Sequence, residues 1–278
     1  MGRHPTLRDR LGVTVLVTGL LVGLYAWGVE PYWLEVTRHS VRGTLVASLR
    51  IAHITDLHTY GLGRRERSLL AILEREKPDV IVITGDSVID GDFFAPKPGL
   101  GEDPSYTRAA EVLHRLRAPL GVWTVKGNWE AIRHVSDERA FYQRNGARLL
   151  SNEVHELRPG VWLAGFDDVY SDPNAGALGQ IPSGAFVIAL FHSPTYFDAI
   201  AGRVDLALAG HTHGGQVRLP FVSPWLPPGS GRYVAGWYEA GGSKLYVSRG
   251  IGTSMLPLRF RCRPELALIT VGPASPAD

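Results

Sequence analysis

Five apolar segments of this chain are each followed directly by residues whose side chains can bind a metal ion. The junctions read Thr55-Asp56-Leu57-His58, Gly85-Asp86, Gly127-Asn128, Phe191-His192 and Gly210-His211-Thr212-His213. Short apolar segments rich in β-branched residues alternate along the chain with charged segments of helical spacing, which predicts an α/β domain. Open α/β sheets bind ligands beyond the carboxyl ends of their strands, so we expect these side chains to converge there.

The hydrophobic pattern also gives approximate boundaries for the elements. Strands are predicted at residues 49–55, 80–84, 122–125, 161–165, 186–191, 206–209, 245–248 and 266–271, and helices at 64–76, 106–117 and 135–145. Residues 93–104 and the proline-rich residues 219–231 show no regular pattern. We interpret both of these segments as surface loops.

A cluster of metal ions explains all five junctions together. An isolated Asp-x-His, Gly-Asp or His-x-His motif is more often a turn or a solvated edge than a ligand set. Burying five such groups without partners would, however, cost several kcal/mol for each. The ordered combination therefore favours a metal site over ordinary packing.

The ligand types narrow the choice of metal. Imidazole combined with carboxylate and amide oxygens suits Mn²⁺, Fe or Zn²⁺ better than Ca²⁺, which prefers oxygen ligands. The single cysteine, Cys262, excludes a cysteine-based zinc site. Two ions about 4 Å apart, bridged by one carboxylate, can activate a hydroxide for attack on a phosphoryl group. We expect two divalent ions bridged by Asp86, with Mn²⁺ as the first choice and Fe or Zn²⁺ as alternatives.

The order and strand context of these motifs resemble the calcineurin-like metallophosphoesterase superfamily over about residues 51–271. The resemblance implies a two-sheet sandwich flanked by helices and a dinuclear metal site. It assigns Asp56, His58 and His213 to the first metal, Asn128, His192 and His211 to the second, and Asp86 to both.

Two further segments resemble a bacterial membrane-associated subgroup of these phosphodiesterases. They are GHTHGGQVRLPF from Gly210 and LYVSRGIGTSMLPLRFRCRPE from Leu245. The resemblance implies hydrolysis of phosphodiester or pyrophosphate bonds at the membrane by metal-bound hydroxide. Some relatives hydrolyse UDP-2,3-diacylglucosamine in lipid A synthesis, which is one alternative substrate. An alternative from another class is a non-catalytic metal-binding envelope protein.

The sequence departs from the superfamily pattern next to Asn128. The family usually continues Gly-Asn with a histidine and an acidic residue, whereas this chain has Trp129 and Glu130. An indole N–H donates a hydrogen bond but delivers no proton at neutral pH, so the usual leaving-group acid is missing. We predict catalytic roles for Asp86, Asn128 and Glu130, the last acting with His134 or a water. The acidic residue usually three positions after the Gly-Asp aspartate is replaced by Ile89.

The N-terminal segment reads as a membrane anchor. Residues 11–29 contain no charge, three arginines precede them, and Trp27, Tyr32 and Trp33 lie around the exit of this segment. This pattern predicts a single pass through the inner membrane with the catalytic domain outside the cytoplasm. Arg38 and Arg42 reduce the charge asymmetry, and a cleaved signal peptide is the alternative.

Three regions follow from these assignments: an anchor at residues 1–35, a metallophosphoesterase domain at 36–272 and a flexible tail at 273–278. The net charge is only +2, so no nucleic-acid partner is expected. Phe221, Trp225 and Trp237 lie shortly after the metal-binding histidines and could line an apolar pocket for a lipid-linked substrate. Ordinary loop packing is the alternative for these three aromatic residues.

Overall fold

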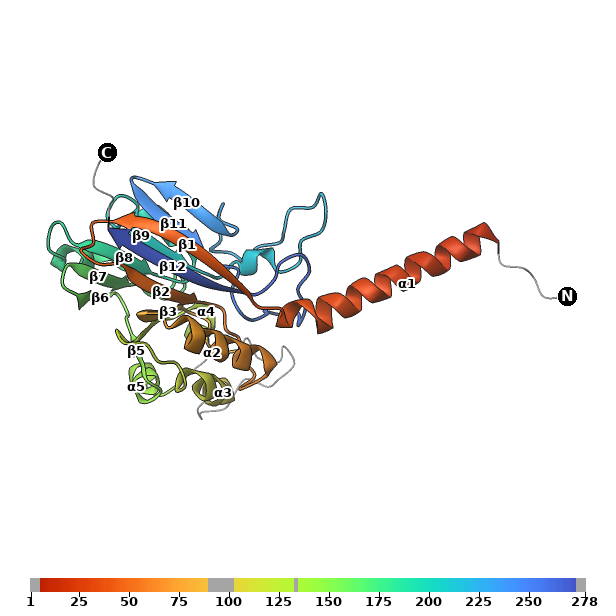
Figure 1. The fold of residues 1–278 in the computed structure, drawn as a ribbon, viewed down its shortest axis with the longest axis horizontal. Helices are drawn as coiled ribbons and strands as arrows, with labels where there is room; N and C mark the ends of the chain where they lie inside the picture. The colour runs from red at the N-terminus through yellow and green to blue at the C-terminus, as the bar shows by residue number, and fades with distance from the viewer. Residues whose placement is uncertain (1–5, 90–102, 133–134, 274–278) are drawn as a thin grey trace.

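Two six-stranded sheets pack face to face in the computed structural model, which describes residues 6–89, 103–132 and 135–273 (Figure 1). The strand orders are β1-β12-β2-β3-β4-β5 in the first sheet and β10-β11-β9-β8-β7-β6 in the second. Helices flank the first sheet on its outer side (Figure 1). The predicted two-sheet α/β sandwich is therefore confirmed.

The first sheet is mixed. Its strands are β1 (Glu35–Gly43), β2 (Leu49–Ile54), β3 (Val80–Thr84), β4 (Val122–Val125), β5 (Ala147–Leu149) and β12 (Glu265–Pro273). Strands β2 to β5 run parallel, whereas β12 pairs antiparallel with β2 and parallel with β1. Every residue of β3 and β4 is buried, as expected for parallel strands that are covered on both faces.

The second sheet has a parallel centre and antiparallel edges. Its strands are β6 (Glu153–Arg158), β7 (Val161–Gly165), β8 (Phe186–Leu190), β9 (Leu206–Ala209), β10 (Gly236–Ala240) and β11 (Ser243–Val247). Strands β7, β8, β9 and β11 run parallel, and the hairpin partners β6 and β10 close the two ends. Hydrogen bonds join the residues at and just after the carboxyl ends of β2, β3, β8 and β9, so these four ends lie at the same edge of the sandwich.

Helices cover the outer face of the first sheet (Figure 1). They are α2 (Arg64–Glu76), α3 (Pro104–Leu113), α4 (Asn128–Ile132) and α5 (Glu138–Arg144), while the short α6 (Phe197–Ile200) packs on the second sheet. A separate core of side chains from both sheets, including Val82, Ile188 and Leu208, fills the space between them. Burial of these apolar side chains holds the two halves of the site together.

Loop predictions agree in part with the structure. Residues 219–231 contain no helix or strand, as expected. Of the predicted loop at residues 93–104, Pro104 begins α3, and residues 93–102 lie outside the described part of the chain. Pro273, the first residue of the predicted tail, pairs with Gly43 at the end of β12, and residues 274–278 lie outside the described part of the chain.

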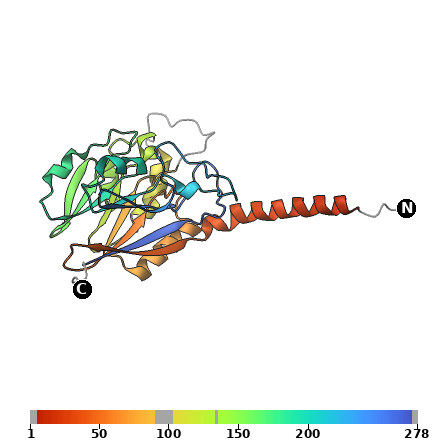
Figure 2. The ribbon, with the colours of Figure 1, turned by 90° about the horizontal axis from the view of Figure 1, so that it is seen from above.

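One long helix projects from the body of the molecule (Figure 1, Figure 2). Helix α1 (Leu7–Gly28) begins at Thr6, whose side chain forms a capping box with Asp9. Only Ala26 is buried within it, and the helix is long and apolar enough to cross a membrane. The charge-free segment 11–29 lies in this helix and its C-cap, Val29.

Candidate metal centre

All seven side chains predicted as metal ligands come together at one edge of the sandwich. Asp56 and His58 follow β2, and Asp86 follows β3. Asn128 begins α4 directly after β4, whereas His192, His211 and His213 follow β8 and β9. Six of the seven are buried, and Asn128 is half-buried. The sheet topology thus brings together the side chains that follow these strands, as the sequence pattern predicted.

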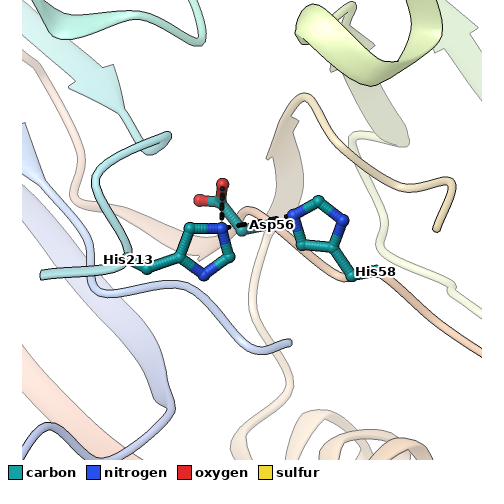
Figure 3. Close-up of side chains that lie close together, drawn as sticks. All are labelled: Asp56, His58 and His213. Atoms are coloured by element: carbon teal, nitrogen blue, oxygen red, sulfur yellow. Dashed lines mark hydrogen bonds and ion pairs between the residues drawn. The ribbon is translucent and has the colours of Figure 1, made fainter. Parts of the chain in front are cut away.

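Asp56, His58 and His213 form the first group (Figure 3). The Nε2 atoms of His58 and His213 lie 3.2 Å apart, and Asp56 Oδ1 lies 3.3 Å from His213 Nε2. Figure 3 shows the carboxylate of Asp56 and the imidazole of His58 on one loop and the imidazole of His213 facing them from a second segment of the chain. Their ligand atoms all lie within 4.8 Å of one another.

A second group surrounds His192. Its Nε2 atom lies 3.1 Å from Asp86 Oδ2, 3.1 Å from His211 Nδ1 and 3.2 Å from Asn128 Oδ1. Asp86 Oδ2 is also 3.6 Å from His58 Nε2. Asp86 therefore stands between the two groups, where a bridging carboxylate belongs.

The spacing of these donor atoms is explained better by coordination of two metal ions than by hydrogen bonds among the side chains. Ligand bonds of about 2.1 Å that meet at roughly 100° place their donor atoms about 3.2 Å apart. The Nε2 atoms of His58 and His213 show this separation, yet a hydrogen bond between neutral imidazoles uses only one N–H. Side chains of the hard and borderline types found here suit divalent Mn, Fe or Zn.

The electrostatics of the centre also call for a cation. Burial would raise the pKa of Asp86, but the imidazoles of His192 and His58 outweigh it and hold that pKa well below its ordinary value. Burial lowers the pKa of His192, but the carboxylates of Asp86 and Asp56 outweigh it and raise that pKa well above its ordinary value. Two buried carboxylates thus attract positive charge to this spot, which metal ions would supply.

The backbone turns sharply at the ligands. Asp56, His58, Asp86, His211 and His213 all have a positive φ, between 37° and 70°. Non-glycine residues rarely adopt this left-handed conformation because of its steric cost. Residues held in it cluster at functional sites, where surrounding structure maintains the strain. Here it turns side chains at the strand ends into the centre.

Glu130 supports the centre from behind. Its carboxylate accepts hydrogen bonds from the backbone N–H groups of Asp86 at 2.9 Å, Ser87 at 2.7 Å and Gly127 at 2.9 Å, and from the Tyr142 hydroxyl at 3.1 Å. Burial and the nearby Asp86 raise the pKa of Glu130 to about 7. The carboxylate is thus occupied with the backbone that carries Asp86. Its predicted partner His134 lies outside the described residues.

A cavity of about 440 Å³ opens beside the metal-binding side chains. Asp86, Asn128, His211 and His213 line it together with mostly apolar residues, which include Trp129, Val217, Trp225, Pro227, Met255 and Leu256. The predicted apolar pocket is therefore present and contains Trp225. The prediction is wrong for Phe221 and Trp237, which are absent from the lining. Trp237 lies in β10 instead, where its ring packs against the rings of Tyr246 and His39.

Sequence reasoning missed the roles of Gln216 and Arg259, which hold the loops beside this cavity. Gln216 donates from Nε2 to the carbonyls of Ser254 and Leu256, both at 3.0 Å, and so holds the loop that supplies Met255. The buried guanidinium of Arg259 donates to the carbonyls of Arg249 and Cys262 at 2.8 Å and 3.1 Å. Both residues stand in the two segments that resemble the membrane-associated subgroup, but only the long-range contacts reveal these roles.

The sequence matches the family model described as calcineurin-like phosphoesterase over residues 49–215. It is 31% identical to YkuE of Bacillus subtilis, described as an uncharacterized metallophosphoesterase, over 98% of each chain. An uncharacterized metallophosphoesterase of Aquifex aeolicus is 30% identical over 91% of this chain and 97% of its own. The phosphodiesterase YaeI of Escherichia coli is 27% identical over 86% of this chain and 89% of its own.

The two-sheet fold and the Asp/His cluster define a metal-dependent phosphoesterase. The chain belongs to the calcineurin-like phosphoesterase family and is a hydrolase of that class.

Proposed function

We propose that this protein hydrolyses phosphodiester or pyrophosphate bonds with two divalent metal ions. Asp56, His58 and His213 would hold one ion. Asn128, His192 and His211 would hold the other, with Asp86 shared. The observation that carries the proposal is the position of Asp86 Oδ2, 3.1 Å from His192 Nε2 and 3.6 Å from His58 Nε2. The similarity to the phosphodiesterase YaeI supports the bond type.

Two bound ions would supply Lewis-acid charge and lower the pKa of a water molecule. Mn²⁺ is our first choice, with Fe or Zn²⁺ as alternatives. The protein's own contribution is orientation. Glu130 fixes the backbone of Asp86, and the carbonyl of Pro228 lies 2.6 Å from His211 Nε2, which directs Nδ1 of that ring toward His192.

Trp129 borders the cavity that would hold the substrate. Trp129 lines the cavity next to Asp86 and Asn128, and its backbone N–H donates to Asp86 Oδ1 at 2.9 Å. Its indole can stack on a leaving group or exclude water but supplies no proton. We therefore propose that leaving groups of low pKa are preferred.

A hydrolysis assay with bis-p-nitrophenyl phosphate and added Mn²⁺ tests the proposal. We expect Asp86→Ala to lower the rate at least about 100-fold and to reduce the bound metal, because both ions lose a ligand. Asp172→Ala is the matched control, since Asp172 is exposed and also has a positive φ, of 61°. Two bound metals without cleavage of any diester or pyrophosphate would instead support the non-catalytic envelope protein.

We further propose that α1 anchors the protein in the inner membrane as a single pass, with the domain outside the cytoplasm. The apolar wall of the cavity supports a lipid-linked phosphodiester as substrate. UDP-2,3-diacylglucosamine remains the alternative substrate, and it requires a cytoplasmic domain because such precursors are cytosolic. Protease added to intact spheroplasts should digest the domain, whereas protection of the domain would favour the alternative.

A further inference from the structure

Two loops beside the cavity expose large apolar side chains to solvent. We call them the apolar rim, which consists of Leu219, Phe221, Val222 and Trp225 in the first loop and Met255 and Leu256 in the second. Phe221 is 108% exposed and Trp225 70% exposed. Soluble surfaces rarely gather so many apolar side chains without a binding partner.

The apolar rim is fixed to the end of α1 through residues 259–261. The Arg259 backbone N–H donates to the Ala26 carbonyl at 2.9 Å, and the Arg261 N–H donates to the buried carboxylate of Glu30 at 3.0 Å. Between them, the Phe260 N–H donates to the Gln216 carbonyl at 3.0 Å. The loops therefore keep a set position relative to the helix.

Aromatic residues mark the depth of this junction in a bilayer. Trp27, Tyr32 and Trp33 are exposed around the end of α1, and such rings prefer the headgroup layer. The Arg263 guanidinium lies 4.2 Å from the Trp33 ring centroid. The two loops that carry the apolar rim, one light blue and one dark blue, reach toward the side on which α1 leaves the body (Figure 1, Figure 2). The apolar rim thus lies near the same depth.

The charge of the two segments suits a lipid surface. Residues 216–232 and 250–263 contain no Asp or Glu. Their five arginines are Arg218, Arg232, Arg259, Arg261 and Arg263, of which Arg259 is buried. Exposed basic groups next to a membrane helix are attracted to anionic lipid headgroups.

We propose that the apolar rim inserts into the headgroup region of the bilayer that α1 spans. Trp225, Met255 and Leu256 belong both to the apolar rim and to the cavity lining. The cavity therefore opens toward the lipid, and a substrate can keep its acyl chains in the membrane while its phosphoryl group reaches Asp86. This inference rests on the proposed membrane anchor and deepens the proposed substrate class.

Site-specific fluorescence tests the insertion with the full chain. An environment-sensitive nitrobenzoxadiazole label is attached at Phe221→Cys, and the protein is reconstituted in vesicles of phosphatidylcholine and phosphatidylglycerol. The native Cys262 is only 1% exposed and should remain unlabelled. Val46→Cys is the matched control, because Val46 is 104% exposed and β1, which ends at Gly43, carries the chain about 30 Å away from α1.

We expect the label at Phe221→Cys to shift its emission to shorter wavelength and to be quenched several-fold more strongly by spin-labelled lipid than the label at Val46→Cys. Equal, weak quenching at both positions in protein that floats with the vesicles would overturn the insertion while leaving the anchor intact. Cross-linking of Phe221→Cys chains to one another without lipid quenching would assign the rim to a second copy. Failure to float would reject anchor and insertion together.

Hydrolysis of soluble bis-p-nitrophenyl phosphate separates this inference from the proposed chemistry. Phe221 and Val222 do not line the cavity. The double variant Phe221→Ser, Val222→Ser should therefore hydrolyse this substrate at the rate of the unmodified chain. A lost rate would show that the substitutions damage the centre, and the insertion would then lose its independent support.

Discussion

At the residue scale, Glu130 shows how a carboxylate behind the centre can control its geometry. Glu130→Gln would place an amide NH₂ against backbone N–H groups that now donate to a carboxylate. We expect the free energy of unfolding to fall by about 2–3 kcal/mol, because a buried donor would be left without an acceptor. Urea denaturation measures this loss, with the exposed Glu74→Gln as control. Equal stabilities would contradict the supporting role.

Trp129 offers a second test at this scale. Trp129→His would place an imidazole in the cavity beside Asp86 and Asn128 and could restore a leaving-group acid. We expect hydrolysis of alkyl diesters to rise on the order of 100-fold, since general acid catalysis contributes about that much. The rate on bis-p-nitrophenyl phosphate, whose leaving group needs no proton, should change little. An unchanged rate on alkyl diesters would argue that no acid is missing.

At the scale of elements, the junction between α1 and the body acts as part of the domain. Glu30 is 1% exposed, and its carboxylate accepts hydrogen bonds from the backbone of Arg261 and Cys262. Cys262 in turn donates from Sγ to the carbonyl of His213 at 3.2 Å. The predicted boundary between anchor and domain near residue 35 therefore separates Glu30 from contacts that reach His213, a candidate metal ligand.

Two shortened chains test this connection. A chain that begins at Gly28 keeps Glu30, whereas a chain that begins at Val36 loses it and leaves two backbone N–H groups without their acceptor. We expect the shorter chain to be less stable by about 2–3 kcal/mol and to bind metal more weakly. Thermal unfolding and metal analysis of both chains measure this difference, and identical behaviour would show that the junction is only a tether.

At the scale of the whole molecule, the centre depends on how closely the two sheets approach. Gly210 follows β9 of the second sheet, and a Cβ atom there would overlap Thr55 and Asp56 at the end of β2 in the first. Gly210→Ala should cost about 1–3 kcal/mol of stability through overpacking. A displacement of Asp56 by about 1 Å would lower the rate on the order of 100-fold.

Gly179→Ala is the matched control for this prediction, because a Cβ at Gly179 meets no atom within 4 Å. Hydrolysis of bis-p-nitrophenyl phosphate and urea denaturation are measured for both variants. Retention of activity in Gly210→Ala would mean that the ends of the sheets can separate without harm to the centre.

The sequence by itself located most of the fold and nearly all of the centre. Strands β3, β4, β7 and β9 and helix α2 have the predicted boundaries. Buried parallel strands must be apolar on both faces, so their sequences stand out, and the ligands that follow them break that pattern at recognisable points. The seven candidate ligands could therefore be predicted from the sequence, without knowledge of any contact.

The tertiary structure decided the edge strands of the two sheets and the residues that support the metal centre. Strands β1, β5, β6 and β10, which sequence reasoning missed, are the four outermost strands of the two sheets. Edge strands carry polar residues and lack an apolar run, so local pattern does not reveal them. The supporting roles of Glu30, Glu130 and Arg259 arise from contacts between distant segments. Such contacts are set by packing, and no local spacing in the sequence encodes them.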